Sequence, residues 1–508
     1  MFFRVIASCL ALLAFSSAAQ ALELDWNGVF RSDFNFVHNY QLNSSDAGNN
    51  YDSAKDAGGY YIKPAGSNNA NFQSLFLKLQ PKLVVNDNIY IKSEFWLGDP
   101  VFGFFGNAAP YQNSQRFYDS TYSRGSLITA QRFWGEFLTD VGTLQVGRAP
   151  LNWGLGVVWS SGEGLWDRFE STGDVVRLVS KFGAFTVIPQ FVYYSAGNTF
   201  GGSCAPGTTA CDPGTGNGTM SDYSLALKYD NTDEDFEGGA NLIHRRSGAA
   251  QDPNSGYVGP TATTAAVSSV NYNIWDLFAR KRFGKFTLAG EAPIVNGSVG
   301  GADYSTFALA AEAGYKPNDT WDFNLKAGHA GGQPNGAQGT FDSYKAFYFH
   351  PNYHLGLVMF NYALYNFHGP NTQNNPNTSS ASLVSPYGDP ITNANYLAMG
   401  STLHAGDKWD FKLGFVLAKA LEAAETGKTF FNKWTRTTAL ANGDQSKSLG
   451  WELDWGTGFQ WDETFRFDLD MGLWFPGGYY KFSNQASDPN NLTTNTVFAT
   501  AAKIGVKF

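Results

Sequence analysis

The last fifteen residues of the chain, 494–508, constrain its fold more than any other stretch. Phe508, Val506 and Ile504 occupy one parity, whereas Lys507 and Gly505 occupy the other. This period of two, apolar on one side only, is typical of a β-strand whose two faces meet different surroundings. Such a strand exposes unpaired backbone N–H and C=O groups at its edge unless another strand pairs with it. The simplest partner for the last strand of a chain is the first strand. We therefore expect a closed β-barrel, with the last strand of a soluble β-sandwich as the alternative.

The same alternation recurs through the chain. Three segments, 318–323, 406–411 and 462–467, each place a short polar turn before an aromatic-led strand. The sequence therefore predicts antiparallel strands joined by short turns at one end of the barrel and by long loops at the other. In the first expected strand, apolar residues alternate with polar ones: Leu24, Trp26, Phe30, Phe34 and Phe36 against Asp25, Asn27, Arg31, Asp33 and Asn35.

Residues 1–21 have the features of a secretory signal peptide. An early positive charge precedes an apolar run over residues 5–15, and Ala19-Gln20-Ala21 provides a small-residue cleavage site. The segment ending at Cys9 also matches a lipoprotein cleavage box in form, but the apolar run continues beyond it. We expect cleavage after residue 21, which leaves 22–508 as one mature, exported domain.

Composition then narrows the class. The mature chain has no apolar run of the ~18 residues that a membrane helix needs, so any membrane crossing must be made by a barrel. The 42 Phe, 25 Tyr and 14 Trp are too many for the inside of a soluble barrel, but they suit a lipid-facing wall with aromatic girdles. The polar faces of the strands then line an aqueous lumen. A formal net charge of −9 argues against nucleic acid as a partner.

The number of strands must be even if both termini are periplasmic. The alternating segments predict an all-β, single transmembrane, antiparallel up-and-down barrel of about 18 strands, with 16–20 as the range. Residues 331–393 form a long loop or a plug. Within them, 341–350 and 354–367 are either two further strands or one folded-in segment, and the irregular sequence 349–356 favours the folded-in segment.

Two stretches resemble Gram-negative outer-membrane proteins. The alternating C-terminus is similar to the signature whose final aromatic residue, here Phe508, is read by the insertion machinery. Segment 140–178 resembles the general porins, in which a turn, a short strand and Gly-Arg precede a loop that folds into the barrel. This resemblance implies that Arg148 is a cation of the pore wall and that 151–172 is the constriction loop, although the predicted barrel size is closer to 18-stranded substrate-specific or export barrels. Parity puts Arg148 on the lipid face, so a bulge at Gly147 or a position beyond the apolar band is required.

The resemblance to porins predicts an electric field across a narrow lumen, between carboxylates of the loop and cations of the wall. Charges in such a lumen interact more strongly than in bulk water. The alternative is that these charges pair in an external loop. Aromatic residues of the same segment either stack on sugar rings or anchor and pack the loop. The candidate constriction residues are Arg148, Glu163, Asp167, Arg168, Glu170, Asp174 and Arg177, and the candidate stacking residues are Trp153, Trp159 and Trp166.

Other motifs carry little chemistry. Cys204 and Cys211 close a short Gly/Pro/Thr-rich loop and predict a disulfide in an oxidising compartment, with a metal site as the less supported alternative. His350 and His354 are four residues apart, but Pro351 between them argues against a metal-binding helix face. No hydrolase elbow, zincin motif or phosphate loop is present, so we expect no enzyme, no cofactor and no metal.

These observations predict a porin-like channel for passive diffusion of small hydrophilic solutes, and selectivity for carbohydrate is one form that this prediction can take. The alternative is a structural or adhesive barrel with a plugged lumen and working surface loops; an outer-membrane lipase lacks a recognisable Ser/His constellation. Expected partners are outer-membrane lipids, lipopolysaccharide, the barrel-assembly machinery during insertion, and small polar solutes. The alternation fits a monomer and a homotrimer equally well.

Overall fold

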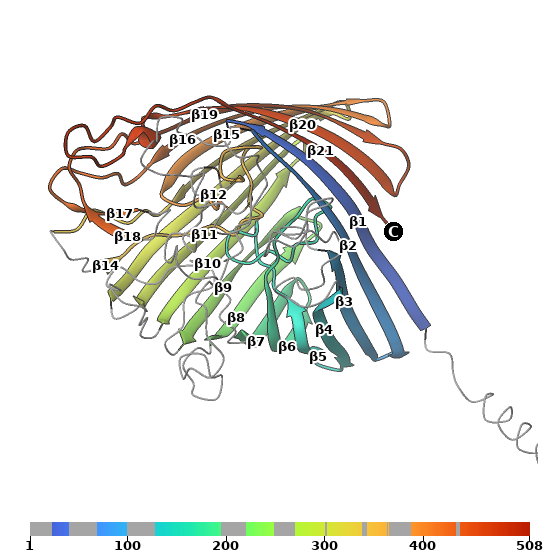
Figure 1. Ribbon diagram of the computed structural model, residues 1–508. Coiled ribbons are helices and arrows are strands. Elements are labelled where there is room, and N and C mark those ends of the chain that lie inside the picture. Colours follow the sequence, from blue (N-terminus) through green and yellow to red (C-terminus); the bar gives the residue numbers. More distant parts are fainter. Residues whose placement is uncertain are drawn as a thin grey trace, which may run out of the picture.

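A computed structural model (Figure 1) describes residues 23–39, 69–98, 128–194, 220–247, 270–299, 302–337, 343–362, 364, 387, 389–432 and 437–508. Nineteen strands share one sheet, and one of them, β14, is a two-residue parallel addition to β12. The remaining eighteen form the barrel. The strands are β1 (Glu23–His38), β2 (Asn69–Asn86), β3 (Ile89–Gly98), β4 (Ile128–Thr139), β5 (Gly142–Pro150), β6 (Thr172–Phe182), β7 (Phe185–Tyr194), β8 (Met220–Asn231), β9 (Phe236–Ser247), β10 (Val270–Phe283), β11 (Phe286–Val299), β12 (Ala302–Asn318), β13 (Trp321–Ala330), β14 (Ser343–Tyr344), β15 (Ala394–Ala405), β16 (Trp409–Ala420), β17 (Thr429–Asn432), β18 (Thr437–Leu440), β19 (Ser448–Gln460), β20 (Phe465–Pro476) and β21 (Val497–Lys507).

The barrel closes between its first and last strands, as predicted. β1 pairs antiparallel with both β2 and β21, and Figure 1 shows β21 beside β1. The chain terminus completes the seam, because the Gly28 N–H donates to the Phe508 carbonyl at 2.8 Å and the Phe508 N–H donates back at 3.1 Å. This reciprocal pair extends the β1–β21 ladder to the last residue of the chain.

Side chains alternate between the two faces of the wall. In β1, Arg31 and Asp33 are buried while Phe34 and Phe36 are exposed. In β10, Asp276 is buried between exposed Trp275 and Leu277. An exposed apolar belt around a buried polar face is the arrangement of a barrel that faces lipid outside and polar groups inside. The predicted fold class is therefore confirmed.

The tight turns are built as their sequences predict. Asn318 accepts hydrogen bonds from the Thr320 and Trp321 N–H groups, both at 3.0 Å. Asp462 accepts from the Thr464 and Phe465 N–H groups, both at 2.8 Å. Side-chain oxygens of Asn and Asp that bind the backbone two residues on are a common way to reverse a chain.

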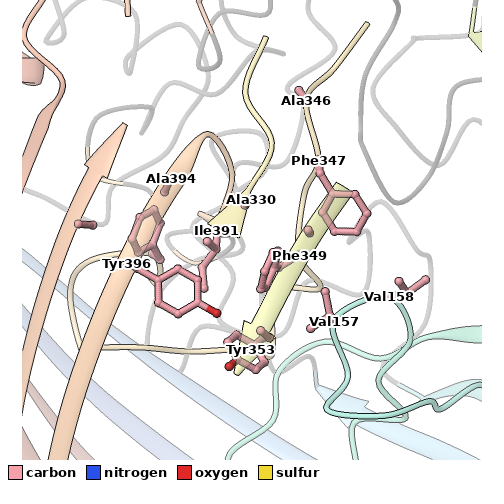
Figure 2. Packing of buried hydrophobic residues seen from close by; sticks show 14 of the residues in the cluster. Val157, Val158, Ala330, Ala346, Phe347, Phe349, Tyr353, Ile391, Ala394 and Tyr396 are labelled. Carbon is pink, nitrogen blue, oxygen red and sulfur yellow. The ribbon is translucent and has the colours of Figure 1, made fainter. Parts of the chain in front are cut away.

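The irregular region after β13 contributes no barrel strand. β13 pairs directly with β15, so the barrel count stays at eighteen, which confirms the preferred prediction. Instead, the described part of this region folds inward, where Phe349, Tyr353 and Val358 are buried. Figure 2 shows Phe349 and Tyr353 packed near Val157 and Val158 of the 151–171 loop. A hydrophobic core thus lies inside the barrel between two loops and the wall.

Two smaller elements are not strands of the barrel sheet. β17 and β18 pair as a separate hairpin, and Gly478–Lys481 forms a short 3₁₀ helix. In the part of the chain that the structure describes, no helix is long and apolar enough to cross a membrane. The predicted signal peptide, and the predicted disulfide between Cys204 and Cys211, lie outside the described residues.

Candidate functional site: two loops inside the barrel

The first inward loop, 151–171, connects β5 to β6. Its ends are held together by the Leu151 N–H, which donates to Ser171 O at 2.9 Å, and the Ser171 N–H donates to Ser160 O, in the middle of the loop, at 2.6 Å. Gly154, Gly156 and Gly162 have positive φ angles, which other residues rarely adopt. The glycines therefore let segment 151–171 fold back into the barrel.

Arg132 of β4 is the centre of the charged contacts at the base of this loop. Its side chain is 1% exposed, and it binds Glu94 of β3 at 3.1 Å. It also binds two loop carboxylates, Glu163 at 2.8 Å and Glu170 at 3.0 Å. A buried guanidinium with several carboxylate partners holds the loop to the wall through charge-assisted hydrogen bonds. Sequence reasoning did not single out Arg132, because nothing in the sequence near it marks it.

The two loop glutamates differ in their protonation. For Glu163, burial is outweighed by Lys78 at 3.4 Å, Gln80 at 3.1 Å and Arg132, so the pKa of this carboxyl is lowered. For Glu170, burial is the largest influence, and the neighbouring Glu94 carboxylate adds to it against the opposing charge of Arg132; the pKa of Glu170 is raised to about 8. Glu163 therefore carries charge at neutral pH while Glu170 is largely neutral.

A second group of charges joins the loop to β1. Arg168 of the loop binds Asp33 at 2.6 Å, and its guanidinium lies 3.8 Å from the centre of the Tyr387 ring. In the opposite direction, Arg31 of the wall donates to the carbonyls of Leu165 at 3.1 Å and of Asp167. The Asp167 backbone, and not its carboxylate, makes this wall contact; the carboxylate accepts from the Gly164 N–H at 2.9 Å.

Arg148 and Asp174 require a correction. The β4–β5–β6 register runs through Gly147 without a shift, although this glycine has a φ of +124°. Arg148 therefore stays on the parity of the exposed Val146, opposite Phe133, which is 60% exposed. Arg148 and Asp174 bind each other at 2.7 Å on this outward face. Strand parity therefore places Arg148 correctly. The bulge at Gly147, one of the two conditions under which Arg148 could be a pore cation, is absent.

Arg177 lies on the inward parity of β6, which it shares with the buried Val175. It donates to Gln145 on the neighbouring strand and to Pro150 O at 3.0 Å. It thus supports the start of the loop rather than pairing with the loop carboxylates.

The three tryptophans divide into two kinds. Trp153 and Trp159 are 6% and 2% exposed and belong to the apolar core between the loops, so their faces are covered by packing. Trp166 is half-buried and donates from its indole nitrogen to Asp468 at 3.1 Å, with Lys503 5.0 Å above its ring. Of the three, Trp166 alone keeps an accessible position among charged groups.

A second inward segment, 343–362, meets the first at one asparagine. The side chain of Asn352 accepts from the Phe169 N–H at 3.0 Å and donates to Ser160 at 3.3 Å. The His350 N–H donates to Val157 O at 2.8 Å. Burial lowers the pKa of His350 to about 4 and that of His354, beside it, to about 3. Both histidines are therefore neutral at neutral pH, as the packed joint requires.

No family model matches the sequence, and no curated protein matches it. Several solved structures are similar to it at low sequence identity, and two of those given next are porins by name. The BenF-like porin from Pseudomonas fluorescens Pf-5 is 8% identical, with a TM-score of 0.48 and coverage of 96% of this chain and 98% of that one. The anion-selective porin from Comamonas acidovorans is 8% identical, with a TM-score of 0.37 and coverage of 96% and 99%. OccK9 (OpdG) of Pseudomonas aeruginosa is 9% identical, with a TM-score of 0.49 and coverage of 96% and 99%.

The described residues contain no cluster of three or more His, Cys, Asp or Glu side chains that could hold a metal ion. The site is thus a set of ion pairs between the wall and the loop. Sequence reasoning found its loop side, Glu163, Arg168 and Glu170. It missed the wall partners Lys78 and Arg132, for which strand alternation predicts the inward face but not the partner.

Proposed function

We propose that the protein is a porin-like channel of the outer membrane through which small hydrophilic solutes diffuse. The observation that supports this proposal is the position of the 151–171 loop, which enters an 18-stranded barrel and places charged side chains against a charged wall. A barrel of this size encloses a lumen that loops must narrow if solutes are to be selected by size and charge. The signal peptide, lipopolysaccharide contact, recognition of Phe508 during insertion and a monomeric or trimeric assembly belong to this proposal.

The preferred solute class is small and polar, and carbohydrate is its narrower form. Trp166 is the residue through which a sugar ring would stack, because Trp153 and Trp159 are buried in loop packing. Charged groups surround Trp166, so small charged solutes are the natural comparison within the same experiment.

A plugged barrel with working surface loops is the second candidate. The observation that favours it is the apolar core that the two inward segments build between them, with Leu151, Val157 and Phe349 almost fully buried. Such packing fills space that a wide pore leaves open.

Liposome swelling separates the two candidates. Vesicles that contain the refolded protein should swell in solutions of small sugars and small zwitterions, and the rate should fall as solute size rises. A Trp166→Ala variant should change sugar entry more than entry of a zwitterion of similar size if sugars stack there. Vesicles that swell no faster than protein-free vesicles would contradict the channel and support the plug.

A further inference from the structure

The tip of each inward loop is held by its own glutamate of the barrel wall. Glu291 of β11 is fully buried and uses both carboxylate oxygens. Oε1 accepts from the Val157 N–H at 3.1 Å and from the Val158 N–H at 3.3 Å, while Oε2 accepts from the Leu155 N–H. The loop therefore leaves the wall at β5 and β6, and its tip binds the wall again at β11, far along the barrel.

Glu452 of β19 does the same for the second segment. It is fully buried, its Oε1 accepts from the Val358 N–H at 2.6 Å, and its Oε2 accepts from the Met359 N–H at 2.6 Å. The next inward residue on the strand, Asp454, accepts from the Leu357 N–H at 3.2 Å. Each glutamate thus receives consecutive backbone amides, an arrangement that suits an anion.

The two tips share a short sequence. Residues 155–158 read Leu-Gly-Val-Val, and residues 355–358 read Leu-Gly-Leu-Val. A glycine also faces each carboxylate, although only the second glycine belongs to the shared sequence. A Cβ on Gly154, one residue before that sequence, would lie 2.4 Å from Glu291 Oε2, and a Cβ on Gly356 would lie 2.8 Å from the Glu452 carboxyl. Close approach of the backbone to the acid therefore depends on glycine at both places.

We propose that Glu291 and Glu452 are positioning residues that set the aperture of the channel, each by clamping a Leu-Gly-x-Val loop tip onto the wall. The inference rests on the proposed channel function. A buried carboxylate is costly unless it is fully hydrogen-bonded, and the contacts given above are to loop backbone. These two acids therefore stabilise the inward position of the loops.

Hydrogen exchange tests the clamp without using conduction. In Glu452→Gln, one carboxylate oxygen becomes an amide nitrogen that cannot accept, so the amides of 357–359 should exchange about tenfold faster or more, as expected for loss of a hydrogen bond to a charged group. The amides of 155–158 should change little. Glu291→Gln should give the reverse pattern. Glu237→Gln is the matched control, because Glu237 also lies on the wall and pairs with Lys228 and Arg280 instead of a loop.

Single-channel recording then tests the consequence. Glu452→Gln and Glu291→Gln should shift the mean conductance and broaden its distribution, whereas Glu237→Gln should leave the distribution unbroadened. Gly356→Ala disturbs the contact with Glu452 from the loop side, and it should reproduce the Glu452→Gln result. Heat-dependent gel migration confirms that each barrel is folded. If exchange and conductance of the clamp variants match those of wild type, the inference is overturned while the channel stands; if wild type itself carries no current, the proposed function fails instead.

Discussion

At the scale of single residues, a buried guanidinium with several carboxyl partners holds the first inward loop to the wall. Arg132 is almost fully buried, and its partners are Glu94, Glu163 and Glu170. Removing one member of such a group leaves uncompensated charge where water is scarce, which costs more than the group contributed when intact. Exposed pairs on the same wall behave differently because solvent screens them.

Replacing Arg132 by Gln should therefore destabilise the folded barrel by about 3–5 kcal/mol. Lys82→Gln is the matched control, because Lys82 pairs with Asp25 where both side chains are substantially exposed, and its loss should cost less than about 1 kcal/mol. Urea unfolding in lipid vesicles, followed by tryptophan fluorescence, measures both. Equal, small changes would contradict the role of Arg132 as the centre of the cluster.

Ion selectivity should depend on pH through Glu170. Its pKa of about 8 means that the side chain gains a negative charge as pH rises through 8, while Glu163, with a lowered pKa, stays charged throughout. Reversal potentials in a salt gradient should therefore move toward cations between pH 6 and pH 9. Glu170→Gln should abolish this step. Glu163→Gln should reduce cation preference at both pH values and keep the step; a step that survives Glu170→Gln would refute the assignment.

At the scale of elements, the two inward segments pack against each other. This packing shields the buried side chains between them from water and from protonation. His350 and His354 are neutral in the joint because burial lowers the pKa of each. A released segment would regain histidines with a pKa near 6.5. The released form then binds more protons than the docked form between about pH 6.5 and pH 4, so docking loses stability as pH falls through this window.

Acid should therefore release segment 343–362 before it unfolds the barrel. Backbone hydrogen exchange of 349–359, corrected for the intrinsic effect of pH, should show weaker protection at pH 5 than at pH 7. A His350→Gln, His354→Gln variant has nothing to titrate in the joint and should lose this pH dependence. Protection that falls equally in the variant would place the acid effect elsewhere.

The closing strand is the second element with a specific test. Gly28 of β1 lies against the terminal ring, since a Cβ there would come within 2.5 Å of the Phe508 ring. Phe508→Ala and Gly28→Leu should both reduce the amount of folded protein in the outer membrane, whereas Lys507→Ala, one residue away, should not. Membrane fractionation with heat-dependent gel migration measures the amount of folded protein in the outer membrane. Normal assembly of Phe508→Ala would contradict the role of Phe508 in the insertion signal.

At the scale of the whole molecule, local periodicity explains what could be predicted. Alternation in β1 and the Asn318 and Asp462 turns depend on neighbours in the chain, so the barrel, its closure and its eighteen strands follow from sequence. The same parity correctly indicated that Arg148 faces outward. The resemblance to porins, which placed it inward, was wrong at that residue.

The contacts between loops and wall could not be predicted in this way. Arg132 meets Glu170 across 38 positions, Glu291 meets Val157 across 134, and Asn352 meets Phe169 across 183. No period connects such pairs, and each residue type is common on a lumen wall. The loop side of the site was identified because its glycines, tryptophans and charges are concentrated in one stretch, whereas the wall side is spread over many strands.

Single-channel recording of the full-length protein in planar bilayers tests the central claim most directly. The account predicts discrete, reproducible current steps from the folded protein, with a conductance small for an eighteen-stranded barrel because two loops occupy the lumen. Glu163→Gln should keep the steps and shift their reversal potential toward anions. Folded barrels that insert without resolvable current steps would contradict the account and identify a plugged barrel.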